Sequence, residues 1–425
     1  MEQQCSIFGK CGGCDIQHLS YEEQIRQKVG RIEQALKFKA DIISPSEPYS
    51  YRNKLDCIIR NSKICMREKN SASRYIELDT CLIASPIIQS LIEEMRAIIQ
   101  TNKHLNWQSA IRVITFRATN AGDTGIYLEF TQGDDNIVKI IKLITQSILS
   151  LPPSTSPTQS APLISSNIAS QTNQTTNIAV PHTASATAVL PPPPTIIITA
   201  KNIAYGICEE GKEYPDKLIA IKGNTYLEEK LNNKIYHFAI NGFFQNNSNG
   251  AEKMLQYVYT ILKHNKDKTQ HILPNTTQNA TLIDLYGGVG TFGIYCADLF
   301  KQTNIVEGVA PAIEFAKDNI KINNIKNATA FCLDAKQLDR IKIQGPTYCI
   351  LDPPRVGMDI RAITNVRNLK PEKIIYISCN PQQLAKDIPK FKEYTLTSLG
   401  IFDMFAQTNH VEVIVELTKK TENSP

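Results

Sequence analysis

The sequence predicts an α/β protein whose C-terminal half is a doubly wound, Rossmann-like parallel sheet, preceded by a mixed α+β region. After residue 280, short apolar runs alternate with stretches of helical periodicity, as in repeated strand–helix units. The glycine turn Gly287-Gly288-Val289-Gly290 directly follows the first apolar run. Polar residues follow several of the predicted strands, at the edge where open parallel sheets bind ligands. These observations together predict the fold class and the side of the sheet that carries the site.

The predicted strands of this half alternate with helices at short intervals. Strands are expected at residues 281–286, 304–307, 328–333, 348–351 and 374–377, and helices at 310–320 and 382–388. Glu307 ends the second strand, 23 residues after Asp284 in the first. A glycine turn and an acid so placed suit a ligand that carries an adenosine. The pattern does not choose between NAD and S-adenosylmethionine.

Cys379 lies where the strand at 374–377 breaks into Ser378-Cys379-Asn380-Pro381. Pro381 suits the first turn of a helix. Cys379 is therefore expected at the carboxyl end of a strand and near a helix N-terminus, which favours a thiolate. A free cysteine also commonly packs as a small hydrophobe, so this stretch alone leaves both interpretations open.

Glu412 lies at the start of a predicted apolar strand, Val413 to Leu417, in which valines alternate along the chain. A carboxylate there either faces solvent or has a raised pKa in a pocket, as a proton acceptor requires. A cysteine nucleophile, a carboxylate base and a methyl donor fit a reaction in which a thiolate adds to C6 of a pyrimidine and C5 then attacks the methyl group. A nicotinamide enzyme has no evident use for Cys379 in this position.

The N-terminus holds three thiols within ten residues, Cys5, Cys11 and Cys14, with two glycines that let the backbone fold around a metal. A fourth ligand has to come from further along the chain. Cys81 is a better candidate than Cys57 or Cys65, because it lies in a loop after a predicted strand, whereas those two lie within predicted strands. Zinc and iron–sulfur clusters use the same thiolates, so the spacing does not fix the metal.

Length and composition indicate two or three domains in a chain of 425 residues with 42% hydrophobic and 20% charged residues. No apolar run has the length of a membrane span, and no secretory signal is apparent, so we expect a cytoplasmic protein with no membrane partner. In that compartment its 11 cysteines are more typical of ligands or catalysts than of disulfides.

The chain is expected to divide into three parts. Residues 1–85 form a metal-binding and basic region, because residues 50–74 carry seven basic side chains against two acidic ones, a pattern typical of phosphate contacts or of a solvated face. Residues 86–235 form a central α+β domain, interrupted at about 151–195 by an uncharged, proline-rich insertion that we expect to be disordered. Residues 236–425 form the catalytic domain.

Several motifs, in this order, resemble those of the RNA 5-methyluridine methyltransferases. They are Cys5…Cys11-x-x-Cys14 with Cys81, Tyr51-Arg-Asn-Lys54, Phe243-Phe-Gln245-Asn246, Asp284-Leu-Tyr286-Gly-Gly288-Val-Gly290-Thr291, Asp352-Pro-Pro-Arg355, Ser378-Cys-Asn-Pro381 and Asp403-Met-Phe…Glu412. The resemblance covers nearly the whole chain apart from the insertion. It departs from the family at Gly287, where many members have Cys, at Ala406, where Pro is usual, and at Asn409, which replaces the first of two His.

The resemblance implies an S-adenosylmethionine-dependent methyltransferase domain with an N-terminal iron–sulfur region, and it gives each matched residue a role. Cys379 would be the nucleophile and Glu412 the base. Gln245, Tyr286, Thr291, Glu307, Asp334 and Asp352 would contact the donor or hold the target site, and Cys5, Cys11, Cys14 and Cys81 would ligate a [4Fe–4S] cluster.

The expected activity is methylation of C5 of a uridine in RNA by a monomeric enzyme. Members with a cluster mostly modify 23S ribosomal RNA, so 23S rRNA is the expected substrate, and the alternative is a uridine in the tRNA T-loop. The chain resembles the shorter members that lack the family's N-terminal RNA-binding β-barrel. An alternative of another class is a non-catalytic RNA-binding assembly factor, against which the presence of both Cys379 and Glu412 argues.

Overall fold

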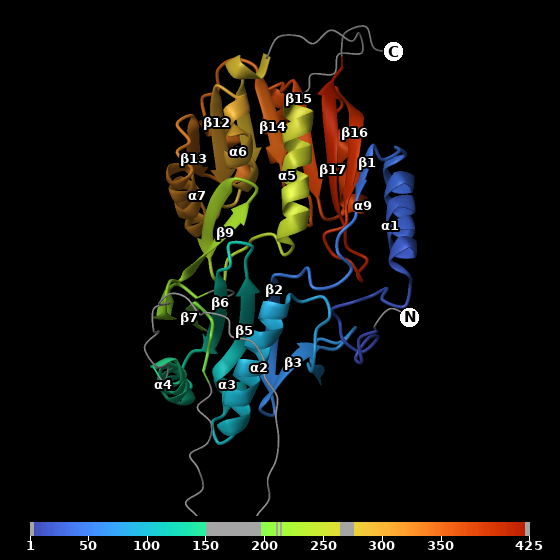
Figure 1. The fold of residues 1–425 in the computed structure, drawn as a ribbon. Coiled ribbons are helices and arrows are strands. Elements are labelled where there is room, and N and C mark those ends of the chain that lie inside the picture. The colour runs from blue at the N-terminus through green and yellow to red at the C-terminus, as the bar shows by residue number, and fades with distance from the viewer. Residues whose placement is uncertain (1–3, 150–196, 210, 213–214, 264–275, 421–425) are drawn as a thin grey trace, which may run out of the picture.

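The computed structural model describes residues 4–149, 197–209, 211–212, 215–263 and 276–420 in two stacked regions (Figure 1). The insertion predicted at about 151–195 lies outside these residues. No helix in the described part of the chain combines the length and the apolar character needed to cross a membrane.

The upper region in Figure 1 is built on an eight-stranded sheet with the order β1-β16-β17-β15-β14-β11-β12-β13. The strands are β1 (Ile42–Ser44), β11 (Thr281–Leu285), β12 (Gln302–Glu307), β13 (Ala328–Cys332), β14 (Thr347–Leu351), β15 (Lys373–Ser378), β16 (Tyr394–Phe402) and β17 (Glu412–Lys419). Neighbouring strands from β13 to β15 run parallel, and β17 is antiparallel to both of its neighbours. The predicted parallel α/β sheet is therefore confirmed. The strand predicted to reach Tyr286 ends at Leu285, because Tyr286 adopts a positive φ of 65°.

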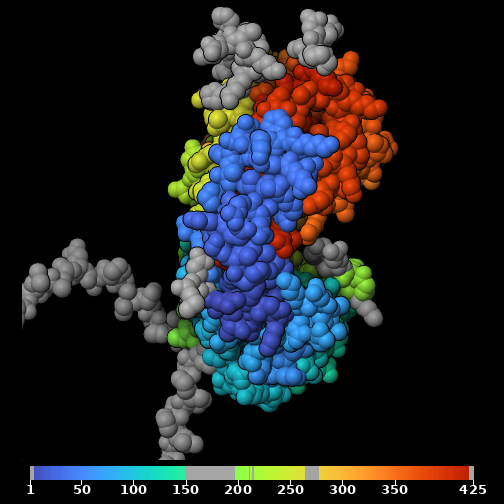
Figure 2. Space-filling view, turned by 90° about the vertical axis from the view of Figure 1, so that its right-hand side faces the viewer, coloured from blue at the N-terminus to red at the C-terminus, as the bar shows by residue number. Residues whose placement is uncertain are grey.

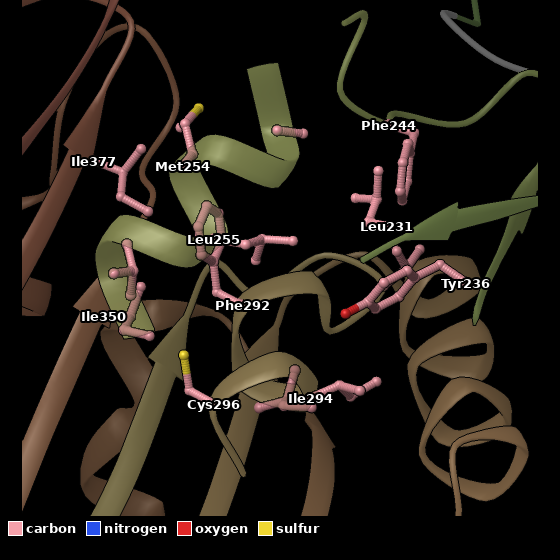
Figure 3. Close-up of a cluster of buried hydrophobic side chains, with 14 of the residues drawn as sticks. Leu231, Tyr236, Phe244, Met254, Leu255, Phe292, Ile294, Cys296, Ile350 and Ile377 are labelled. Atoms are coloured by element: carbon pink, nitrogen blue, oxygen red, sulfur yellow. The ribbon is translucent and has the colours of Figure 1, made fainter. Parts of the chain in front are cut away.

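Helices cover both faces of this sheet, as the doubly wound class requires. They are α1 (Tyr21–Leu36), α5 (Ser248–Lys263), α6 (Thr291–Cys296), α7 (Ala310–Ile322), α8 (Ile360–Asn368) and α9 (Pro381–Asp387). One face packs against α5, α6 and α7, where Met254, Leu255 and Ile294 lie over Ile350 and Ile377 of the sheet (Figure 3). The other face packs against α1, α8 and α9 through a separate cluster of buried apolar residues.

The lower region is a seven-stranded sheet with the order β4-β3-β2-β5-β6-β7-β8. Its elements are β2 (Lys54–Arg60), β3 (Lys63–Arg67), β4 (Tyr75–Glu77), β5 (Ile111–Ala118), β6 (Thr124–Thr131), β7 (Asn202–Cys208) and β8 (Leu218–Lys222), with α2 (Pro86–Thr101), α3 (Trp107–Ala110) and α4 (Asn136–Leu149). The domain boundary predicted at residue 85 falls inside this single sheet, because β2 pairs with β5 across it. The proposed three-part division stays a prediction.

Two segments join the regions. The hairpin of β9 (Tyr226–Leu231) and β10 (Lys234–Ala239) is fixed to α7 by the Asn319 and Asn323 side chains, which bond to the β10 backbone. The N-terminal segment lies along one side of both regions in Figure 2, because α1 packs on the upper sheet and β1 adds a strand beside β16. The first 50 residues therefore contact the C-terminal part of the chain.

Candidate active site

The topology places most of the predicted site residues at one edge of the upper sheet. From β11 the chain proceeds outward to β12 and β13 and then crosses back to β14 and β15, so the order reverses between β11 and β14. Open parallel sheets bind ligands in the crevice at such a point, outside the carboxyl ends of the strands. The residues at or just beyond those ends are Tyr286 and Thr291 after β11, Glu307 in β12, Asp334 after β13, Asp352 after β14 and Cys379 after β15.

The glycine turn after β11 is shaped for close backbone approach. Gly288 has a φ of 55°, and its N–H donates to the Glu307 carboxylate at 3.1 Å. The Val309 N–H donates to the other Glu307 oxygen at 2.8 Å. A side chain at Gly287 would place its Cβ 2.7 Å from Ile305 and 2.9 Å from Asp284 Oδ2. The turn therefore packs directly on β11 and β12.

Asp284 lies beneath this turn and is fully buried. Its Oδ2 accepts from the Gly293 N–H at 2.8 Å, which holds the start of α6 against β11. Burial raises the pKa of Asp284 to about 7, partly opposed by this hydrogen bond.

Cys379 and Glu412 are brought together by strand register. In the antiparallel ladder Ser378 lies opposite Val413, so Cys379, one residue further, lies beside Glu412 at the end of the ladder. Glu412 is only 7% exposed, and burial raises its pKa well above its usual range, with the Asp352 charge as a second cause. Of the two alternatives left open for Glu412, the structure therefore shows the buried one.

The thiol of Cys379 is not activated in the way that the sequence predicted. Its pKa is raised to about 11, chiefly by burial and then by the charges of Glu412 and Asp352, and the Arg355 guanidinium partly opposes these effects. The expectation that the helix N-terminus favours a thiolate is wrong for this state of the protein. Desolvation and two nearby carboxyl groups outweigh the end of α9, which is only 7 residues long.

Asp352 lies between the crevice and Cys379. Burial raises its pKa to about 7, and the charges of Asp284 and Glu307 act in the same direction. Its N–H donates to the Leu285 carbonyl at 3.3 Å, which ties the loop after β14 to the end of β11. The carboxyl groups of Asp284, Glu307 and Asp352 disfavour one another's ionisation by charge repulsion. This edge of the sheet therefore favours a cationic or proton-donating ligand.

Gln245 is joined to the motif at 51–54, and Asp334 lies just after β13. The Asn53 side chain donates to the Gln245 carbonyl at 3.1 Å, and the Asn53 N–H donates to the Asn246 carbonyl at 2.9 Å. Two of the recognised motifs, 51–54 and 243–246, are thus in direct contact. Asp334 is exposed and accepts from the Lys336 N–H at 2.8 Å, as the cap of a short 3₁₀ helix.

Sequence reasoning missed the buried contacts between α1 and the loop that precedes Glu412. Lys28 and Asp403 form an ion pair of 2.7 Å in which both side chains are 2% exposed. Gln24 donates to the Gln407 side chain at 2.9 Å and accepts from the Gln407 N–H at 2.9 Å. The α1 periodicity gave no signal for these contacts, because Lys28 has the sequence character of a solvated helix residue.

The four predicted thiol ligands are close enough for electrostatic interactions between their sulfurs. Burial raises the pKa of Cys14 to about 12, with further contributions from the Cys81, Cys11 and Cys5 sulfurs, and the pKa of Cys11 is likewise raised by burial and by Cys81 and Cys5. Within the described residues, no three His, Cys, Asp or Glu side chains are arranged closely enough to hold a metal ion. The donor set itself fits a thiolate-binding cluster, since it offers four sulfurs and the Arg52 cation near three of them.

Four basic side chains of the segment 50–74 are paired with carboxylates. Its ion pairs are Lys54–Asp56, Lys63–Glu77, Lys69–Asp15 and Arg74–Glu68. Arg60 lies over the Tyr75 ring at 4.7 Å and Arg67 donates to the Ala72 carbonyl, and neither has a carboxylate partner in the part of the chain that the structure describes. Arg60 and Arg67 are therefore the stronger candidates for phosphate contacts.

Comparison with known proteins relates this chain to a family. The family model described as tRNA (Uracil-5-)-methyltransferase matches residues 216–420. A tRNA (uracil(54)-C(5))-methyltransferase of Pyrococcus horikoshii is 26% identical over 416 residues, which are 97% of this chain and 85% of that protein. The chain belongs to the RNA 5-methyluridine methyltransferase family.

Other members of the family align over similar lengths. A protein of Chlorobaculum tepidum described as an uncharacterized RNA methyltransferase is 24% identical over 97% of this chain and 82% of its own. The crystal structure of the Pyrococcus abyssi tRNA (uracil-54, C5)-methyltransferase in complex with S-adenosyl-L-homocysteine has the same fold, with a TM-score of 0.68, 21% identity and coverage of 96% of this chain and 86% of that one. As a member of this family, the protein is an S-adenosylmethionine-dependent RNA (uracil-C5) methyltransferase.

Proposed function

We propose that this enzyme methylates C5 of a uridine in tRNA, with Cys379 as the nucleophile and Glu412 as the base. The observation that carries the proposal is the β15–β17 register, which puts a half-buried thiol beside a buried carboxyl group at the ligand edge of the sheet. A thiol and a base held together in this way fit covalent catalysis, in which one difficult step is divided into two easier ones.

In this mechanism Cys379 and Glu412 act in different steps. The Cys379 thiolate adds to C6 of the uracil, and the electron pair of the C5–C6 double bond makes C5 nucleophilic. When bound, S-adenosylmethionine supplies the electrophilic methyl group that C5 takes. The Glu412 carboxylate then accepts the C5 proton, the double bond re-forms, and the Cys379 thiolate is expelled.

The donor would lie in the crevice between β11 and β14, in contact with Gln245, Tyr286, Thr291, Glu307, Asp334 and Asp352. Glu307 is the best supported of these positions. Two backbone N–H groups fix its carboxylate at the end of β12, where it can accept from the hydroxyl groups of a ribose.

The choice of tRNA rests on the relatives. Three Pyrococcus proteins, from P. horikoshii, P. abyssi and P. furiosus, are named as tRNA (uracil(54)-C(5))-methyltransferases and align with 97–98% of this chain at 25–26% identity. The comparisons offer no specific support for 23S rRNA, the substrate first expected, so the T-loop uridine is the preferred target.

A direct assay separates these substrates. Unmodified tRNA and 23S rRNA transcripts are incubated with the protein and methyl-labelled S-adenosylmethionine, and 5-methyluridine is mapped in each, with Cys379→Ala as the inactive control. We expect labelling of a T-loop uridine in tRNA. Labelling of 23S rRNA alone would show that the substrate is wrong, and labelling of neither RNA would show that the function is wrong.

We further propose that Cys5, Cys11, Cys14 and Cys81 hold a [4Fe–4S] cluster with a structural role. The support is the four-sulfur donor set near Arg52, and its position against the loop before Glu412, where Cys14 and Cys81 pack on Tyr51 and Ala406.

A further inference from the structure

Val356 is an apolar side chain at the tip of a turn beside the nucleophile. The Gly357 N–H donates to the Pro354 carbonyl at 2.8 Å, which closes a β-turn with Arg355 and Val356 as its two central residues. Val356 is 80% exposed, the largest exposed fraction among the exposed large apolar side chains of the described residues. Gly, Asn, Asp and Ser are common at turn tips, so a β-branched apolar residue there is unusual.

The turn is held rigidly at several points. The Asn380 side chain donates to the Arg355 carbonyl at 3.0 Å, and the Met358 N–H donates to the buried Asp387 carboxylate at 3.2 Å. A Cβ on Gly357 would lie 2.5 Å from Asp387 Oδ2, so the turn rests directly on α9. Two prolines, Pro353 and Pro354, restrict the backbone that leads into it.

The same contacts place the turn next to the reacting residues. Asn380, which holds the Arg355 carbonyl, directly follows Cys379. Burial raises the pKa of Cys379, and the Arg355 guanidinium opposes that rise, which places this cation close to the thiol. Val356 is therefore exposed on a turn that is held by Asn380, the residue next to Cys379.

The depth of that site requires the target base to leave its stack. Glu412 is 7% exposed and Cys379 is half-buried, so C6 of a uracil reaches both only if the nucleotide is extruded from its neighbours. Extrusion leaves a gap and costs stacking free energy. Proteins that open base steps commonly insert an apolar side chain into the gap, which compensates for the lost stacking.

We propose that Val356 is the wedge that occupies the position of the extruded uridine, in contact with the nucleobase next to it in the RNA. The proposal rests on the proposed function, since it takes an RNA uridine as the substrate. An apolar, β-branched side chain on a rigid turn suits this task because little conformational entropy is lost when bases close on it.

The test compares Val356→Ala and Val356→Leu with a control, Val138→Ala, which truncates a valine that is 60% exposed on α4. Each protein is assayed on a folded T-loop transcript and on the same transcript with an abasic site next to the target uridine. Without that neighbouring base, extrusion disrupts one stacking contact fewer, and the wedge has no nucleobase to contact at that position. Thermal unfolding and S-adenosylmethionine affinity are measured for every variant.

We expect Val356→Ala to lower kcat/KM about tenfold on the folded transcript, because truncation removes two methyl groups that become buried between bases. On the abasic transcript we expect Val356→Ala to cause only a small loss. Val356→Leu is expected to retain activity, and the thermal unfolding and donor affinity of every variant should be unchanged. An equal loss on both transcripts, no loss on either, or weakened donor binding would overturn the wedge. If the wild type methylates neither transcript, the proposed function itself fails.

Discussion

Replacing Glu412 by Gln tests whether Cys379 and Glu412 act in separate steps, as proposed. Gln has nearly the same shape, so the β15–β17 ladder is preserved, but it cannot accept the C5 proton. In the proposed mechanism Cys379 acts before methyl transfer and Glu412 after it, so the variant should still attack the uracil and take up the methyl group. It should then accumulate a methylated RNA–protein adduct, because the thiolate cannot leave until the C5 proton is removed.

The size of the effect follows from the role of a positioned base. A general base typically accelerates its step by about 10²–10⁴-fold, which corresponds to about 3–5 kcal/mol in the barrier. Glu412 is buried and adjoins the end of β15, so bulk water has little access to replace it. We therefore expect product release to slow by a factor in this range, whereas adduct formation keeps its rate.

The adduct is measured on denaturing gels with labelled RNA and, separately, with a labelled methyl group. A 5-fluorouridine RNA should trap the wild type in the same way, because fluorine does not leave as a proton does. The matched control is Glu416→Gln, which changes a carboxylate of the same strand that is paired with Lys373 at 2.7 Å. Normal turnover of Glu412→Gln without an adduct would place the base elsewhere, and C5 methylation by Cys379→Ala would refute the covalent mechanism.

Four further outcomes are expected. Protein purified without oxygen should be brown and contain nearly equal iron and sulfide at the N-terminal thiols, and stoichiometric zinc without sulfide would contradict a cluster. Lys28→Met should lower the free energy of unfolding in denaturant by about 3–5 kcal/mol, because Asp403 would remain buried without its cation, and a change below about 1 kcal/mol would contradict this. Neutralising Arg60 and Arg67 should reduce the salt dependence of RNA binding by up to about one unit of slope for each lost phosphate contact, and an unchanged slope would assign both residues to an ordinary solvated surface. Capture of 5-fluorouridine RNA should accelerate about tenfold per pH unit from pH 7 to 9, since only the thiolate attacks and the pKa of Cys379 is raised to about 11, whereas a flat profile would contradict that pKa.

Local sequence signals were enough to predict the parallel sheet and the edge that carries the site. Strand composition, the glycine turn and the ends of the apolar runs are local signals, and the carboxyl ends of parallel strands necessarily meet at one edge. Once that edge was known, the positions of Glu307, Asp352 and Cys379 followed from their places at the ends of β12, β14 and β15.

Which of these groups meet, and how their pKa values shift, depends on contacts between segments that are distant in the chain. Cys379 lies beside Glu412 because β17 inserts antiparallel between β15 and β16, a pairing that neither strand specifies locally. Local reasoning gave the wrong direction for the Cys379 pKa, since desolvation and neighbouring carboxyl groups come from distant segments. Lys28 likewise has the local character of a surface residue, and only the docking of α1 on the loop before Glu412 buries it against Asp403. Periodicity records which face of an element is apolar, whereas burial and charge pairing depend on what that face finally packs against.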